Sequence, residues 1–328
     1  MTQTNPKSAP LLVPEIAIER LSYGPYGISR LDGKAVMIPH TAPGDCVSAQ
    51  ITEDKERYSI GEMTRLIRPS PLRQVPPCQY VGRCGGCSWQ HLRYDAQLKA
   101  KEQSVHDALS RIGKLRDFEL RPIIGSPAES HYRRRIRLQV GGDRQLGFYG
   151  AGSHNLIEID SCWIAAQPLN ELIEPLRRWN AELGTVIDHI EIISGDQPHE
   201  TVAVARANNI FAGRDERLCE ELVASANDLA GLIVSCRDGR RIWGQSTITV
   251  ALHDDLALQL DADVFSQVNP ASNRQMIEQL LRAGNFQPDD CVLELYCGAG
   301  NFTLPIARRV KEIVAVEGFR PAITNGTL

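Results

Sequence analysis

Short stretches in which apolar residues alternate with polar ones, or run together, mark the first part of the chain as β-rich. Four of them have strand length, at residues 16–21, 35–39, 46–52 and 59–67. Turn signals lie between them: Tyr23-Gly24-Pro25-Tyr26-Gly27, Asp32-Gly33 and Ala42-Pro43-Gly44-Asp45. This series predicts a small barrel of the OB type over residues 1–72. Such barrels bind RNA in some proteins and only protein in others, so the barrel alone does not decide function.

A proline-rich joint, from Pro69 to Pro77, follows the barrel. Beyond it, apolar residues recur at helical spacing and predict a helix over 93–112 that Gly113 ends. From about residue 121 to residue 260 strands dominate, with one helix expected over 168–182. The predicted strands are 135–140, 146–150, 156–160, 189–194, 201–207, 231–236 and 248–253. We therefore expect an α+β central domain over 73–262, with helix 93–113 packing on the last part of the chain.

The pattern changes after residue 262. A helix over 273–283 precedes a short buried strand over 292–296, a glycine turn, a helix over 303–310 and a second strand over 313–316. This alternation is typical of the start of a doubly wound, Rossmann-like α/β domain, here residues 263–328.

Composition narrows the class of protein. The 328 residues are 42% hydrophobic and 23% charged, which excludes a disordered or fibrous chain. No apolar stretch approaches the roughly 20 residues that cross a bilayer, and the first ten residues are polar. We therefore expect a cytoplasmic monomer without a membrane partner. In that compartment the nine cysteines point to metal ligation, buried thiols or catalysis rather than disulfides.

Charge is distributed unevenly. The net charge is −4, but residues 65–150 contain 16 Lys and Arg against 7 Asp and Glu, a local charge of +9. The remainder then carries −4 − 9 = −13. A basic middle in an acidic chain indicates either a surface that binds a polyanion such as RNA or a solvated charged face.

One cysteine group has metal-ligand spacing. Cys78-x5-Cys84-Gly85-Gly86-Cys87 brings three thiols together, and Cys162 is a credible distant fourth. A compact triplet with one remote cysteine favours a [4Fe–4S] cluster over zinc. The alternatives are zinc on the triplet with His91, and unrelated buried thiols. Four other cysteines, Cys46, Cys219, Cys236 and Cys291, lie in or beside apolar patterns and are expected to pack in the core rather than bind a metal.

A basic strand follows at residues 131–138. On a strand, Arg133, Arg135 and Arg137 share one face, where their guanidinium groups suit contacts with RNA phosphates. The alternative is an exposed edge strand that its charges keep soluble.

The glycine turn after strand 292–296 suggests a nucleoside site. Gly298 and Gly300 allow the backbone to approach a ligand, and Glu317 follows at the end of the next strand, where a carboxylate can accept both ribose hydroxyls. A dinucleotide site would favour a third glycine where this chain has Thr303. An adenosyl ligand with a single ribose therefore fits better.

Together these features resemble the bacterial ribosomal RNA uracil-5-methyltransferases of the TRAM-domain, iron–sulfur type, the RumA/RlmD-like group. The resemblance spans the barrel, the cysteine group, the Tyr-Arg-Arg-Arg strand, Phe265-x-Gln267-Val268-Asn269 and Glu294-Leu295-Tyr296-Cys297-Gly298-x-Gly300-Asn301-Phe302. It implies a structural [4Fe–4S] cluster on Cys78, Cys84, Cys87 and Cys162. It also implies S-adenosylmethionine contacts from Gln267, Tyr296, Asn301 and Glu317, beside the two turn glycines Gly298 and Gly300.

The resemblance further implies C5-methylation of one uridine in 23S ribosomal RNA, with no DNA partner. In that family a cysteine thiolate adds at uracil C6, which makes C5 nucleophilic towards the methyl donor, and a general base then removes the C5 proton. The target base is first flipped out of its stack. The family's nucleophile segment lies in later strands than those found here, and Cys297 belongs to the cofactor turn. We therefore assign no catalytic residue and expect a C-terminally truncated member that does not methylate RNA.

Two other classes of protein remain open from the sequence. One is a non-catalytic iron–sulfur or zinc RNA-binding module. The other is a nicotinamide or flavin oxidoreductase with a redox cluster, which would need the pyrophosphate site that Thr303 argues against.

Overall fold

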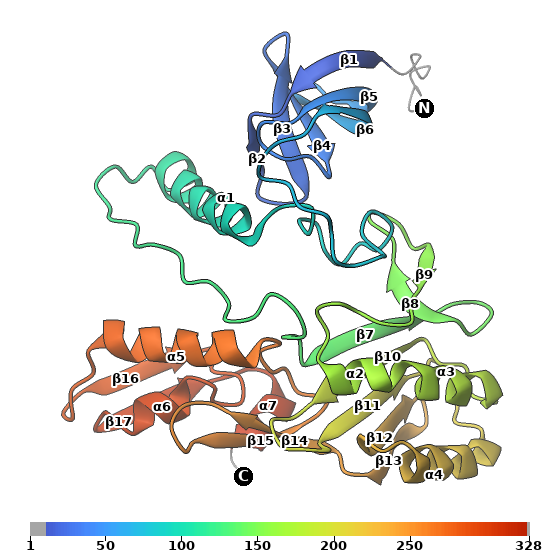
Figure 1. Ribbon diagram of the computed structural model, residues 1–328. Helices are drawn as coiled ribbons and strands as arrows, with labels where there is room; N and C mark the ends of the chain where they lie inside the picture. Colours follow the sequence, from blue (N-terminus) through green and yellow to red (C-terminus); the bar gives the residue numbers. More distant parts are fainter. Residues whose placement is uncertain (1–10, 327–328) are drawn as a thin grey trace, which may run out of the picture. The chain divides into compact units, whose positions relative to one another are not determined.

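The computed structural model describes residues 11–326 and divides the chain into two compact units, residues 1–125 and 126–328 (Figure 1). The division falls within the region expected to form the central domain, and the three-domain division stays a prediction. None of the helices in residues 11–326 combines the length and the apolar character needed to cross a membrane.

The first unit begins with a six-stranded sheet of order β1-β5-β6-β4-β3-β2. Its strands are β1 (Leu12–Ala17), β2 (Arg20–Leu21), β3 (Tyr26–Leu31), β4 (Lys34–Pro39), β5 (Cys46–Asp54) and β6 (Tyr58–Arg68). β4 and β6 pair in parallel and the other neighbours are antiparallel. The sheet curls because β5 and β6 carry register shifts, and β1 comes close to β3. Inward-facing Val13, Val36, Ile38 and Val47 belong to its core.

Strand β3 lies where the sequence predicted only a turn. Gly27 explains why a strand is possible there, because a Cβ atom at this position would come within 2.1 Å of Thr41 Oγ1 and 2.8 Å of Ile18 Cγ2. Only glycine permits such close approach within a strand.

After the sheet, the cysteine-containing loop leads into helix α1 (Tyr94–Asp107) and the π-helical turn η1 (Ala108–Ile112), as the sequence predicted. The loop is tied to the barrel by buried Asp45, which accepts bonds from the Ser70 N–H at 2.8 Å and from Arg73 Nη2 at 2.7 Å.

The second unit is built on a seven-stranded sheet of order β13-β12-β11-β10-β7-β8-β9, in which only β11 and β12 pair in parallel. The strands are β7 (Arg135–Val140), β8 (Leu146–Tyr149), β9 (Leu156–Glu158), β10 (His189–Ser194), β11 (Thr201–Arg206), β12 (Leu229–Cys236) and β13 (Gly239–Gly244). The helices that accompany this sheet are α2 (Gln167–Glu171), α3 (Ile173–Glu182) and α4 (Glu216–Ser225), with a 3-10 turn η2 (Gly213–Asp215) before α4. Figure 1 shows these helices along the sheet.

A hairpin of β14 (Thr247–Ala251) and β15 (Ala257–Asp261) connects this sheet to the last part of the chain. There β16 (Cys291–Leu295) and β17 (Glu312–Val316) pair in parallel, flanked by α5 (Pro270–Gly284), α6 (Thr303–Ala307) and α7 (Arg320–Gly326). The strand–helix–strand order predicted for a Rossmann-like segment is present. One continuous core joins Val204 of the large sheet, Leu258 of the hairpin and Ile277 of α5.

Candidate functional site

The turn between β16 and α6 holds a backbone conformation that its glycines make possible. Gly298 and Gly300 have φ values of 60° and 99°, and no atom lies within 4 Å of a Cβ built at Gly298. The backbone conformation, rather than crowding, therefore requires glycine at position 298. Tyr296 also adopts a positive φ, 59°, and its side chain is 89% exposed. A bulky residue in this region is strained, and such strain collects at functional sites.

Glu317, directly after β17, braces this turn from the neighbouring strand. One carboxylate oxygen accepts the Gly298 N–H at 2.9 Å, and the other accepts the N–H groups of Gly318 and Phe319, each at 2.8 Å. The bonds from Phe319 and Gly298 lower the pKa of Glu317, so it is charged at neutral pH. An ionised carboxylate has about four acceptor positions, of which three are used here. One position remains for a ligand hydroxyl, rather than the two expected from the sequence.

A pocket of about 310 Å³ opens beside the turn. Five of the six residues predicted to contact the methyl donor line it: Gln267, Tyr296, Gly298, Asn301 and Glu317. The sixth, Gly300, belongs to the same turn and lies beside Thr303. The structure thus brings together residues from three separate segments of the chain.

Apolar residues form much of the remaining wall. The hairpin contributes Val250, Leu258 and Leu260, and two phenyl rings at Phe265 and Phe319 are 67% and 54% exposed. Nothing in the sequence marked Phe319 as a site residue, because it belongs to no alternating or helical pattern. Its position two residues after Glu317 was the available signal.

Asn301 is held in place by a buried partner on α5. The side-chain amides of Asn301 and Asn273 exchange hydrogen bonds of 2.8 and 3.0 Å, and Asn273 is only 1% exposed. Sequence reasoning missed Asn273, although it lies one helical turn after Asn269. The pairing fixes which way the Asn301 amide points.

Hydrogen bonds hold the two residues that follow Gln267. The Val268 carbonyl accepts the Arg134 N–H at 2.8 Å. Asn269 caps α5 by accepting the Ser272 N–H at 3.0 Å, and it donates to Ser126 Oγ at 3.0 Å. The Phe-x-Gln-Val-Asn motif therefore begins α5 and presents Gln267 to the pocket.

Two ionisable groups of this region have raised pKa values. Burial raises the pKa of the Cys297 thiol, and the charges of Glu294 and Glu317 raise it further. Burial also raises the pKa of Glu294, which accepts a bond from Thr303 Oγ1 at 2.6 Å. Cys297 is therefore held as a thiol, which agrees with its exclusion as a nucleophile.

The predicted arginine face is only partly free. Strand β7 lies between β10 and β8, so the alternative of an edge strand is wrong. Arg135 and Arg137 share a face, since both pair with Glu191, with Nε–O distances of 2.9 Å. Arg135 is 15% exposed at its side chain and also donates to the carbonyls of Ala262 and Val264, whereas Arg137 is 56% exposed. Arg133 precedes the strand, and its backbone forms an isolated parallel β-bridge with that of Ala165.

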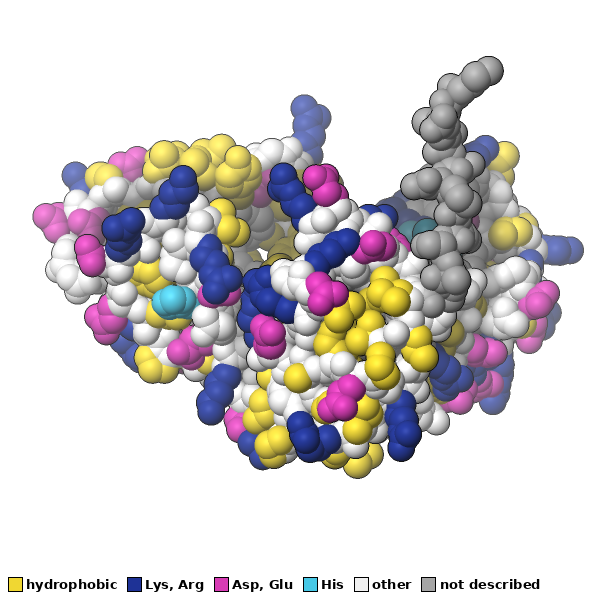
Figure 2. Space-filling model, turned by 90° about the horizontal axis from the view of Figure 1, so that it is seen from above, with side chains coloured by type: hydrophobic (Ala, Val, Ile, Leu, Met, Phe, Trp, Pro, Cys, Tyr) yellow, Lys and Arg dark blue, Asp and Glu magenta, His cyan; other side chains and the backbone are white. Residues whose placement is uncertain are grey.

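Surface charge is mixed in sign on the face drawn in Figure 2. In the face drawn in Figure 2, dark blue Lys and Arg side chains are interspersed with magenta Asp and Glu. RNA binding by Arg133, Arg135 and Arg137 stays a prediction, and the Arg137 side chain is more exposed than that of Arg135.

The predicted metal ligands fall in both units. Cys78, Cys84 and Cys87 lie in the first unit, half-buried and free of disulfides, and Cys162 lies in the second. Burial raises the pKa of Cys84, and the nearby thiols Cys87 and Cys78 add to the effect. Within residues 11–326, no group of three or more His, Cys, Asp or Glu is gathered closely enough to hold a metal ion.

The zinc alternative, with His91 as a ligand, stays a prediction. His91 is 4% exposed, and its Nε2 lies 3.1 Å from the Thr41 carbonyl. Burial lowers its pKa. This ring packs against the barrel. Of the cysteines assigned to packing, Cys46 and Cys219 are buried, but Cys291 is exposed, because its side of the β16–β17 sheet is uncovered.

The geometry fits a small charged nucleoside ligand, and family comparisons agree. Residues 93–327 match the family model described as tRNA (Uracil-5-)-methyltransferase, and residues 15–72 match the TRAM domain of tRNA (uracil(54)-C(5))-methyltransferase. The chain belongs to the RNA (uracil-5-)-methyltransferase family. The family uses S-adenosylmethionine as its methyl donor, and the predicted N-terminal barrel is its TRAM domain.

Curated relatives support the same family. The 23S rRNA (uracil(1939)-C(5))-methyltransferase RlmD of Aeromonas hydrophila is 34% identical over 93% of this chain and 70% of its own length. The enzyme of the same name from Haemophilus parainfluenzae is 32% identical, over 96% of this chain and 72% of its own length. An uncharacterised RNA methyltransferase of Synechocystis is 30% identical, over 99% of this chain and 76% of its own length.

A solved structure shares the fold. The tRNA (uracil-54, C5)-methyltransferase of Pyrococcus abyssi, determined with S-adenosyl-L-homocysteine, superposes with a TM-score of 0.72 at 21% identity. The match covers 95% of this chain and 75% of that chain. The match shows that the two chains share their fold.

Proposed function

We propose that this chain acts in the S-adenosylmethionine-dependent C5-methylation of a specific uridine in 23S ribosomal RNA, in the cytoplasm. The observation that carries the proposal is the 310 Å³ pocket in which Gln267, Asn301 and Glu317 meet. The choice of ribosomal RNA rests on the relatives with 32% and 34% identity, whose names give that substrate.

Each wall of the pocket has a part in holding the methyl donor, which supplies an electrophilic methyl group when bound. Glu317 accepts one ribose hydroxyl at its remaining acceptor position. Asn301 and Gln267 offer amide donors and acceptors to the polar groups of the ligand. Phe265 and Phe319 offer exposed ring faces to the adenine base.

No described residue is assigned as the nucleophile or the general base. Cys297 lies in the donor pocket and is held as a thiol. A non-catalytic RNA-binding module is the competing function, and it differs in having no use for the methyl donor.

Photocrosslinking separates these functions. The full chain is irradiated with tritiated S-adenosylmethionine, and its affinity for a 23S ribosomal RNA fragment is compared with that for transfer RNA. We expect label in the protein, competed by S-adenosylhomocysteine, and tighter binding of the ribosomal fragment. Absence of label, or a preference for transfer RNA, contradicts the proposal. Multiple-turnover methylation of the ribosomal fragment would confirm the proposed reaction.

We also propose a [4Fe–4S] cluster on Cys78, Cys84, Cys87 and Cys162. The support is the Cys78-x5-Cys84-Gly85-Gly86-Cys87 spacing and the Gly86 N–H, which donates to Cys84 Sγ at 3.4 Å, as backbone N–H groups do to the sulfur ligands of a cluster. Anaerobic purification with iron, zinc and sulfide analysis tests it. We expect about four irons and four sulfides per chain, lost in Cys84→Ser and kept in Cys219→Ser. One zinc without sulfide contradicts the cluster.

A further inference from the structure

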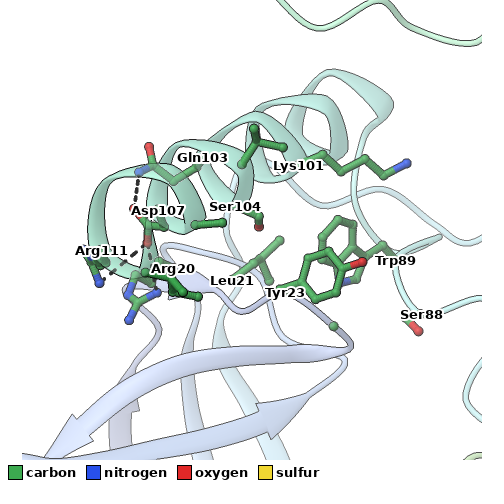
Figure 3. A pocket seen from close by; sticks show the side chains of 14 residues that line it. Arg20, Leu21, Tyr23, Ser88, Trp89, Lys101, Gln103, Ser104, Asp107 and Arg111 are labelled. Atoms are coloured by element: carbon green, nitrogen blue, oxygen red, sulfur yellow. Dashed lines mark hydrogen bonds and ion pairs between the residues drawn. The ribbon is translucent and has the colours of Figure 1, made fainter. Parts of the chain in front are cut away.

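A second and larger pocket lies within the first unit, between the barrel and helix α1. It has a volume of about 710 Å³, within the range of ligand sites. Figure 3 shows Tyr23 and Trp89 at one end of it and Arg20, Asp107 and Arg111 at the other. The methyl-donor site uses none of these residues.

The aromatic end presents the exposed ring of Tyr23 and the half-buried Trp89. The Tyr23 side chain is 95% exposed. Among the residues that the structure describes, neither Tyr23 nor Trp89 has an aromatic neighbour in ring contact. The indole N–H of Trp89 is withdrawn from solvent and has no hydrogen-bond partner in the described chain. Buried polar groups are nearly always paired, so an acceptor is missing at this end of the pocket.

The opposite end holds two guanidinium groups that share one carboxylate. Asp107 lies 3.8 Å from Arg20 of β2 and 3.6 Å from Arg111 of η1, and it accepts a bond from Gln103 at 2.9 Å. The bond from Gln103 and the two arginines lower the pKa of Asp107, so it stays charged and keeps the arginines beside each other. With Lys101, the pocket has three cationic side chains against one carboxylate.

The helix side of the pocket is apolar but not covered. Val105 and Ile112 line it and are 47% and 82% exposed. Both belong to the apolar residues whose helical spacing predicted the helix over 93–112: Tyr94, Leu98, Val105, Leu109 and Ile112. At the other end of this apolar series, Tyr94 and Leu98 lie beside Gly125. Aromatic and apolar faces at one end with cations at the other match a planar base joined to a phosphate.

Resting on the proposed function, we infer that this pocket is a stacking subsite for an unpaired base of the RNA, separate from the uridine that is methylated. The base stacks on the exposed ring of Tyr23, and an acceptor on its edge accepts from the indole N–H of Trp89. The adjacent phosphate pairs with Arg20 and Arg111. The subsite thereby fixes the RNA on the TRAM domain by one base as well as by charge.

Tyr23 is the residue to change, because a side chain so exposed contributes little to folding. Binding of a fluorescein-labelled single-stranded oligoribonucleotide to the full chain is compared with binding of the same oligonucleotide carrying an abasic position. Wild type should prefer the intact RNA. Tyr23→Ala should bind it roughly 5- to 150-fold more weakly, the range for loss of one stacked base, and should no longer distinguish the abasic RNA. Tyr23→Phe should keep both properties.

A matched pair of arginine variants separates the contribution of charge to RNA binding from that of stacking. Arg111→Ala should weaken both RNAs equally and reduce the salt dependence, whereas Arg217→Ala, an exposed arginine of α4, should change neither. Unchanged intact-to-abasic preference in Tyr23→Ala overturns the inference. If Tyr23→Ala keeps the preference and has a lowered melting temperature, the pocket is a packing face for the chain itself. If it keeps the preference with an unchanged melting temperature, the pocket is a site for a protein side chain. S-adenosylhomocysteine binding, measured in the same samples, should be equal in all variants, and its absence from wild type would contradict the proposed function independently.

Discussion

The amides of Asn273 and Asn301 hold each other by two hydrogen bonds, one in each direction, of 2.8 and 3.0 Å. Asn273 is buried on α5 and does not line the donor pocket, while Asn301 does. Asn273 is therefore a positioning residue for Asn301. The pair links the helix before the Rossmann-like segment to the turn inside it.

We predict that Asn273→Ala weakens S-adenosylhomocysteine binding and lowers the free energy of unfolding by about 1–3 kcal/mol, because it leaves the Asn301 amide without its buried partner. Calorimetry and urea unfolding measure the two effects. Asn180→Ala is the control, since it removes another fully buried amide, on α3. It should lower stability and leave the affinity unchanged. Equal affinity in wild type and Asn273→Ala would contradict the positioning role.

Glu317 makes ligand binding sensitive to acid. Its folded-state pKa lies below the usual 4.5 because the charged form accepts N–H groups from Phe319 and Gly298. The stabilisation of the turn is therefore present above the unfolded pKa and is lost as the pH falls through the lowered folded pKa. We predict that S-adenosylhomocysteine affinity falls on acidification below pH 4.5, wherever circular dichroism shows the fold intact.

Glu317→Gln should weaken binding at neutral pH and remove that acid-dependent step. The control is Glu312→Gln, an exposed carboxylate at the other end of β17. It should keep the wild-type affinity and pH profile. An unchanged profile in Glu317→Gln would show that another group is responsible.

The ion pair of Arg134 and Asp196 is expected to support the fold strongly. Its N–O distance is 2.5 Å, and the Arg134 side chain is only 3% exposed. Asp196→Ala should lower the free energy of unfolding by about 3–5 kcal/mol, since it leaves a buried guanidinium unpaired. The control pair on α4, Arg217 with Glu221, is exposed, and Glu221→Ala should cost about 0–1 kcal/mol. Denaturant unfolding compares them, and equal losses would contradict the account.

One face of the β16–β17 sheet is predicted to cause self-association. Cross-strand partners Leu293 and Val314 are 64% and 51% exposed on this face. Exposed apolar patches on unpaired strands favour association. Changing both to Lys should lower light scattering at high protein concentration without changing S-adenosylhomocysteine affinity. Scattering that stays the same would show that another surface associates.

The sequence predicted the elements with strong local patterns. Strands β7 and β10 begin and end where predicted, because their alternation is regular. Strands β3, β13 and β15 and helices α4 and α7 were missed, and the strand predicted over 16–21 is divided between β1 and β2. In β3 a Gly-Pro turn signal obscured the strand, which forms because Thr41 and Ile18 approach Gly27 closely.

The candidate site shows the same division between local and long-range information. The turn glycines and Glu317 were readable because one strand–turn–helix–strand unit contains them all. The Arg135 pairing was not, since Glu191 lies on a strand that only the tertiary fold brings beside β7. The pocket's phenyl rings at Phe265 and Phe319 likewise come from segments that the fold alone unites.

Titration of the full chain with S-adenosylhomocysteine in a calorimeter, with NADH titrated in parallel, tests the central claim most directly. The account predicts one S-adenosylhomocysteine bound per chain, a weaker affinity in Asn301→Ala, and no heat from NADH. A folded chain that binds NADH, or that gives no heat with S-adenosylhomocysteine, would contradict the methyl-donor pocket.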